Sequence, residues 1–209
     1  GETDIFLHKL DPVGNLLWSK QWGTPHSDES RSLAVDSQGN VLLLGATYGS
    51  FDGTSPTYEH DLFLLKLAPD GTELWLSQNH AISNGRHLAV TENDDVVVAG
   101  TYGSELDGFA ALTPKWSRYT ADGSLLWTGV VDSGPMSYND KVNGLVVDPY
   151  GNLFVSVGYI YSNYSTGYWE SRGFLSKYNT GPDLSPPLLT VKPSLYDPAS
   201  RSLRLVGNH

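Results

Sequence analysis

The side chains that could do chemistry in this sequence are histidines and carboxylates scattered through polar segments. A pair of carboxylates could act as acid and base in glycoside hydrolysis, and histidine beside carboxylate could hold a metal ion. No metalloprotease, serine-hydrolase or phosphate-binding motif contains them. We therefore expect no catalytic residue, no metal and no cofactor, and we favour a protein that is not an enzyme. The residues considered are His26, His60, His80, Asp28, Asp52, Asp107 and Asp140.

A second group of carboxylates lies in short turns, where Asp is followed closely by Gly. Such turns occur at Asp11–Gly14, Asp36–Gly39 and Asp148–Gly151. A calcium loop needs oxygen ligands at several alternate positions, and no run of that kind is present. In a hairpin turn, by contrast, Asp accepts hydrogen bonds from its own backbone and Gly takes a positive φ. The pattern predicts turns and not calcium sites.

Two motifs alternate along the chain and define the elements that carry these turns. Each motif consists of two β-rich runs around a polar turn, which predicts a tight hairpin. The first motif begins Asp4-Ile-Phe-Leu-His-Lys-Leu, continues to Gly14 and Trp18, and recurs at Gly71 with Trp75 and at Gly123 with Trp127. The second begins Leu33-Ala-Val-Asp and recurs from Leu88, from Leu145 and, loosely, from Leu195.

Two residue types recur inside the first motif. We expect its tryptophans to pack between neighbouring repeats, because a large aromatic side chain at a fixed repeat position usually serves the core. Its lysines, Lys9, Lys66 and Lys177, share one strand position. Three equivalent lysines predict a solvated face or an outward-pointing stem, and not three active sites.

Together the two motifs resemble the bacterial-type β-propeller repeat family, often called seven-bladed β-propeller repeats, in about four copies. The resemblance implies an all-β propeller and no single activity, because such repeats are structural units. The second copy departs from the family turn with Asn93-Asp94-Asp95, and the fourth copy lacks the Trp.

Counting four strands per blade predicts one propeller domain over residues 1–209 with four blades of four antiparallel strands. Three blades span about 28–80, 84–133 and 138–193. The fourth is expected to join a C-terminal hairpin, 194–209, to the N-terminal hairpin, 1–23, and so to close the ring. The alternative is a partial propeller from a longer ring.

Composition limits the partners. The 209 residues carry 13 Lys and Arg against 23 Asp and Glu, a net charge of −10, and contain no Cys. The acidic excess disfavours nucleic acid and anionic lipid, and the lack of Cys excludes disulfides and thiolate chemistry. No segment is long and apolar enough to span a membrane. We expect an extracellular, periplasmic or organelle-lumen location.

The connections within each hairpin motif are short, whereas those between motifs are long and differ in every copy. Variable loops on a rigid scaffold commonly carry binding, so we expect the long-loop face to bind a protein partner, with the chain acting as a subunit of a larger assembly. A carbohydrate-binding propeller and a polysaccharide-active glycosidase or lyase are the alternatives. The expected binding residues are aromatic: Tyr48, Tyr102, Tyr159, Tyr161, Tyr164, Tyr168 and Trp169.

Overall fold

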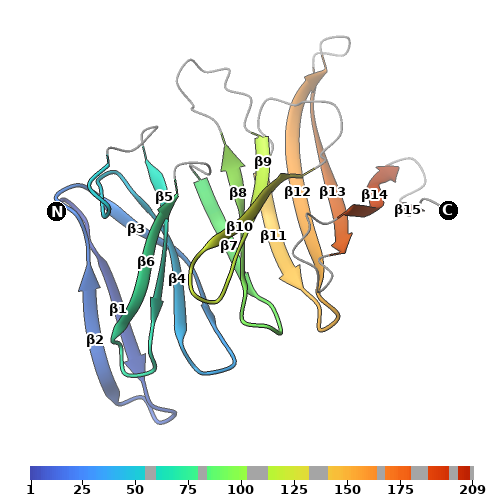
Figure 1. Ribbon diagram of the computed structural model, residues 1–209. Helices are drawn as coiled ribbons and strands as arrows, with labels where there is room; N and C mark the ends of the chain where they lie inside the picture. Colours follow the sequence, from blue (N-terminus) through green and yellow to red (C-terminus); the bar gives the residue numbers. More distant parts are fainter. Residues whose placement is uncertain are drawn as a thin grey trace.

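The computed structural model shows a row of antiparallel β-sheets (Figure 1). It describes residues 1–54, 60–79, 84–102, 113–131, 141–163, 168–179, 188–197 and 202–207. Every regular element in these ranges is a strand, which confirms the all-β prediction. Within the same ranges there is no helix of the length and hydropathy that a membrane crossing requires.

The strands form four sheets, numbered here I to IV along the chain. Sheet I contains β1 (Ile5–Leu10) and β2 (Leu16–Trp22). Sheet II contains β3 (Asp28–Val35), β4 (Val41–Thr47), β5 (Asp61–Leu67) and β6 (Glu73–Asn79). Sheet III contains β7 (Asn84–Val90), β8 (Val96–Tyr102), β9 (Thr113–Tyr119) and β10 (Leu125–Val130). Sheet IV contains β11 (Lys141–Val147), β12 (Asn152–Asn163), β13 (Tyr168–Asn179), β14 (Leu188–Asp197) and β15 (Ser202–Gly207).

The predicted closure of a four-bladed ring is wrong. β15 pairs with β14 as a fifth strand of sheet IV, while β1 and β2 pair with each other in a separate two-stranded sheet. The two ends of the row lie on opposite sides of the molecule in Figure 1. The described strands therefore form a partial propeller, which was the alternative.

The link between the third blade and the expected last hairpin explains this outcome. We expect the last strand of the third blade to end at Val191 and the last hairpin to begin at Ser194, which leaves two residues between them. In the structure both segments belong to one strand, β14, because two residues cannot carry the chain from the outer edge of one blade to the inner edge of the next. Elsewhere this crossing takes more residues, as between Trp22 and Asp28. Pro193 lies within a register shift of the β14–β15 pair, where a strand tolerates a residue without an N–H group.

The cores lie between consecutive sheets. All seven residues of β5 are buried, and six of the seven in β4, because neighbouring sheets cover both faces of these middle strands. Their sequences accordingly read as continuous apolar runs and not as strict alternation. The prediction for the tryptophans is confirmed, since Trp18, Trp75 and Trp127 each pack into a hydrophobic cluster between two sheets.

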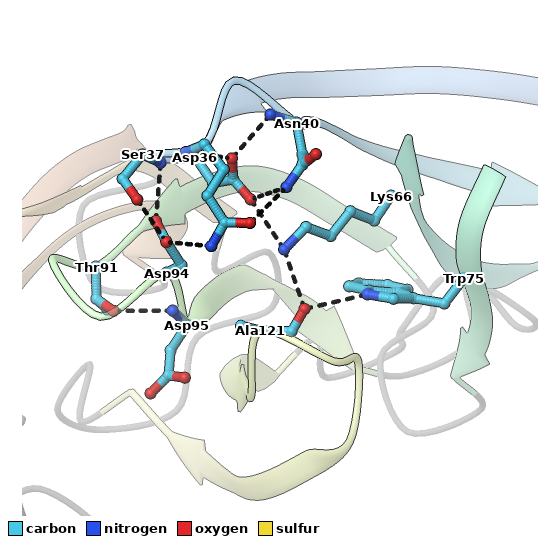
Figure 2. Close-up of polar contacts among 10 residues, drawn as sticks. Asp36, Ser37, Asn40, Lys66, Trp75, Thr91, Asp94, Asp95 and Ala121 are labelled. Carbon is cyan, nitrogen blue, oxygen red and sulfur yellow. Dashed lines mark hydrogen bonds and ion pairs between the residues drawn. The ribbon is translucent and has the colours of Figure 1, made fainter. Parts of the chain in front are cut away.

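Lys66 overturns the predicted solvated lysine face. Its side chain is only 5% exposed, and its ammonium lies 2.9 Å from an Asp36 carboxylate oxygen that is fully buried. It also donates to the Ala121 carbonyl oxygen at 3.0 Å, to which the Trp75 indole donates at 3.1 Å (Figure 2). We call Lys66, Asp36, Trp75 and Ala121 the Lys66 latch; it fastens sheet II to the β9–β10 turn of sheet III.

The Asp–Gly segments form the predicted turns. Asp36 accepts hydrogen bonds from the Gln38 and Asn40 amides, and Gly39 has a φ of +80°. In the second copy Asp94 adopts a φ of +62° without being glycine. Its carboxylate accepts hydrogen bonds from the amide and hydroxyl of Ser37 in the neighbouring sheet, a contact that glycine could not make (Figure 2).

Candidate functional site

The first strands of sheets II, III and IV line a hollow of about 410 Å³. β3, β7 and β11 lie next to one another as the first strands of consecutive sheets, and the hollow lies along these three strands. We call it the inner-strand hollow. Its lining residues come in pairs from the three strands: Ser30 and Arg31, Arg86 and His87, and Val142 and Asn143.

A β-bulge recurs at the same place in all three strands. In β3 the register steps from Ser30 opposite Gly45 to Ser32 opposite Leu44, which leaves Arg31 unpaired. In β7 the same step passes over Arg86, and in β11 it passes over Asn143. A bulge turns the side chain of its extra residue away from the regular alternation. The repeat thus directs one polar side chain per blade towards the hollow.

The cationic groups of the hollow differ in how they are compensated. Arg31 forms an ion pair with Glu29 at 2.6 Å, whereas Arg86 is exposed and has no ion-pair partner among the described residues. His87 Nε2 lies 3.0 Å from the Val142 carbonyl oxygen. Because a carbonyl oxygen only accepts, His87 must carry its proton on Nε2.

These donors give the hollow a defined chemistry. Two guanidinium groups, the Asn143 amide and the Ser30 hydroxyl offer hydrogen-bond donors from three sheets, and an arginine fork matches the two oxygens of an oxyanion. This site was not predicted from the sequence. A signal was present, because Arg31, Arg86 and Asn143 each stand two residues before the Leu that opens the second motif.

Of the predicted binding tyrosines, Tyr48 is the one whose side chain the structure describes. The residue is 39% exposed and its ring lies 5.2 Å from the His60 ring, centroid to centroid. Its amide donates to the Ser27 carbonyl oxygen at 2.9 Å. Tyr48 therefore both stabilises the stem of its loop and presents part of its ring at the surface.

The structure places most of the remaining predicted residues by their backbone. Tyr102 ends β8, opposite Thr113 of β9. Tyr159 and Tyr161 lie in β12, and Tyr168 and Trp169 begin β13. Tyr164 lies outside the described residues, as do the side chains of the other five.

The β12–β13 hairpin brings four of these residues together. Its twelve-residue strands pair without a register shift from Asn152 opposite Asn179 to Asn163 opposite Tyr168. Residues opposite each other share a face, and alternate residues along a strand do so too. The register puts positions 159, 161 and 168 on one face of the hairpin and position 169 on the other.

The scattered carboxylates have hydrogen-bond partners where the structure describes them. Asp28 accepts hydrogen bonds from the Thr24 amide and hydroxyl, and so closes the connection between β2 and β3. Asp52 accepts from Thr54 in its own loop. Over the described ranges, no three His, Asp or Glu residues gather as metal ligands would. His80, Asp107 and Asp140 lie outside those ranges.

Comparison with known proteins agrees with this architecture. Residues 17–52, from β2 to the loop after β4, match the model of the Beta-propeller repeat family. The chain contains a β-propeller repeat. This match confirms the resemblance seen in the sequence, and the matched segment includes the Arg31 bulge.

Two longer proteins are similar to this β-propeller chain. One is an uncharacterized WD repeat-containing protein, L264, of Acanthamoeba polyphaga mimivirus, 30% identical over 162 residues that make up 71% of this chain and 11% of that protein. Another is the regulatory protein FlaEY of Caulobacter vibrioides, 28% identical over 134 residues, 57% of this chain and 14% of that protein. The chain thus spans a small fraction of the length of these relatives.

Proposed function

We propose that this chain is a non-catalytic propeller module that binds a protein partner through the end of the sheets opposite the tight turns. The observation that carries the proposal is the β12–β13 hairpin. Its strands have twelve residues each, whereas the equivalent strands β4, β5, β8 and β9 have seven. In Figure 1 this hairpin rises beyond the neighbouring sheets at the end opposite the tight turns.

The composition of the hairpin supports recognition of a protein. Tyr159, Tyr161, Tyr168 and Trp169 stand among Ser, Asn and Gly residues. Rigid aromatic side chains combined with small polar residues are typical of recognition loops, and Tyr and Trp are enriched at interface hot spots. The relatives are a WD repeat-containing protein and a regulatory protein, which is consistent with a module that works by binding.

Replacing aromatic residues at each end of the sheets tests the proposal. A Tyr168→Ala, Trp169→Ala double variant should bind the partner at least about tenfold more weakly, the loss expected for hot-spot aromatics. Tyr150→Ala is the matched control, because Tyr150 is 85% exposed and lies in the β11–β12 turn at the other end. The measurement is quantitative capture from lysate, then titration of the purified partner. Equal binding by both variants would overturn the proposal.

A glycan array separates this function from the carbohydrate-binding alternative. The proposal predicts no binding to neutral or acidic glycans that depends on Tyr168 and Trp169. A glycan bound by the unchanged chain and lost in the double variant would replace the protein partner with a sugar.

A further inference from the structure

We propose that the inner-strand hollow binds a single carboxylate group, carried either by a small organic acid or by an Asp or Glu side chain of a peptide. The proposal does not depend on the β12–β13 hairpin, since the residues that form the hollow lie on β3, β7 and β11. It concerns a ligand site separate from the proposed aromatic contact.

Three equivalent side chains converge on the hollow. Arg31, Arg86 and Asn143 are the extra residues of bulges at one repeat position, and all three line the same hollow. A bulge costs ladder hydrogen bonds and is common where a strand must redirect a side chain at a functional site. Three sheets therefore supply hydrogen-bond donors to one volume.

The size and the lining of the hollow suit a small anionic group. A hollow of about 410 Å³ is within the range of small-molecule sites, roughly 300 to 1,000 Å³. Its polar lining is rich in donors, namely two guanidinium groups, an amide and a hydroxyl. Arginine forks form bidentate hydrogen bonds with carboxylate and phosphate oxygens, which selects an oxyanion over a neutral or cationic ligand.

The net charge of the hollow distinguishes a carboxylate ligand from a phosphate. Glu29 already compensates Arg31 at 2.6 Å, so among the described residues the arginines of the hollow offer one uncompensated positive charge, on Arg86. One carboxylate balances that charge. A phosphate group near its dianionic form would bring a second negative charge into a protein whose net charge is already −10.

Isothermal titration of the full chain tests the proposal with N-acetylglutamate α-amide, which carries one carboxylate, and with its neutral glutamine counterpart. We expect the acid to bind and the neutral amide to bind at least about tenfold more weakly, as hydrogen bonds to charged groups imply. A capped Gly-Gly-Glu-Gly-Gly peptide distinguishes the sources. Tighter binding of the peptide points to a peptide ligand, and equal binding points to a small acid.

The variants locate the site. Arg86→Gln should weaken binding of the acid at least about tenfold, whereas Lys20→Gln, which removes one exposed positive charge on β2, should leave it unchanged. Glu29→Gln frees Arg31, so it should strengthen binding of inorganic phosphate about tenfold, a gain that misfolding could not produce.

Three results would overturn the proposal. They are equal binding of the acid and its neutral counterpart, equal weakening by Arg86→Gln and Lys20→Gln, and a Glu29→Gln variant whose phosphate affinity does not rise.

Discussion

The Lys66 latch and the inner-strand hollow use the same repeat in opposite ways. In the latch, a cation at a repeated strand position is buried and satisfied by the Asp36 carboxylate and the Ala121 carbonyl. In the hollow, the exposed Arg86 guanidinium at another repeated position has no such partner among the described residues. The repeat therefore places polar side chains at fixed positions. Where such a side chain is buried it holds the sheets together, and where it is exposed it remains available to a ligand.

A second copy of the latch shows which part of it is general. Lys9 donates to the Pro69 carbonyl oxygen at 2.6 Å, and the Trp18 indole donates to the same oxygen at 3.1 Å. In both copies a Lys and a Trp donate hydrogen bonds to one carbonyl oxygen in a turn of the next sheet. Among the described residues, Lys66 has a buried carboxylate partner, Asp36, whereas Lys9 has no carboxylate partner. The two copies therefore provide a matched pair for experiment.

The largest effect should come from Lys66→Met. Removing the ammonium leaves Asp36 as a buried carboxylate without its cation, which should lower the free energy of unfolding by about 4 kcal/mol. Lys9→Met is the control and should cost about 1 kcal/mol, because Lys9 is partly exposed and loses one hydrogen bond to a carbonyl. Urea unfolding at pH 7 measures both, and equal losses would contradict the role given to Asp36.

The pH dependence of the same pair sharpens this test. Burial alone would raise the pKa of Asp36, but hydrogen bonds from Lys66 and Asn40 hold it below its ordinary value of 3.8. Stability from the ionised carboxylate is thus present above pH 3.8 and is lost as the pH falls through the lowered pKa. The difference in the free energy of unfolding between the unchanged chain and Lys66→Met should become smaller below pH 3.8. A difference that stayed constant with pH would argue against the ion pair.

An intermediate effect on stability is expected in the β9–β10 turn, whose Ala121 carbonyl belongs to the Lys66 latch. Gly123 has a φ of +90°, and a Cβ there would lie 2.9 Å from Trp75, so Gly123→Ala should destabilise by about 2 kcal/mol through strain and overpacking. Gly14→Ala has the same backbone strain, φ +93°, but no atom within 4 Å of its Cβ, and should cost about 1 kcal/mol. Thermal unfolding measures the loss of stability in both variants. Equal losses would show that the contact with Trp75 is unimportant.

The smallest effect should come from the hollow. Arg86→Gln should change the free energy of unfolding by less than about 0.5 kcal/mol, because the side chain is exposed and forms no ion pair among the described residues. The same urea series measures it. A loss comparable to that of Lys66→Met would assign Arg86 to the fold and not to a ligand.

The hairpins and the Trp packing could be predicted from the sequence because they depend on local chemistry. Gly39 and Gly151 take the positive φ that their turns require, and the repeated Trp has the same surroundings between each pair of sheets. Ring closure was predicted wrongly, because counting strands does not show which edge the last strands join. The two-residue link at 192–193 settled that choice in favour of sheet IV.

The site was harder to predict for a related reason. The sequence shows that aromatic residues are concentrated near Tyr161. It does not show the hairpin that brings them together. The charged partner of Lys66 could not be predicted either. Asp36 lies 30 positions away in the sequence and contacts Lys66 from the other side of β4. Bulges at Arg31 and Arg86 depend on the register between strands, which the sequence of one strand does not reveal.

The central claim is that the tight-turn end of the sheets is structural, whereas the inner-strand hollow binds a ligand. Mapping amide chemical shifts on addition of N-acetylglutamate α-amide tests this claim most directly. The largest shifts should fall on the amides that flank the three bulges, at Ser30–Ser32, Arg86–His87 and Asn143–Gly144. Ser37, Asp94 and Ala121, at the tight-turn end, should not shift. Shifts centred on the tight turns, or spread evenly over the sheets, would contradict the account.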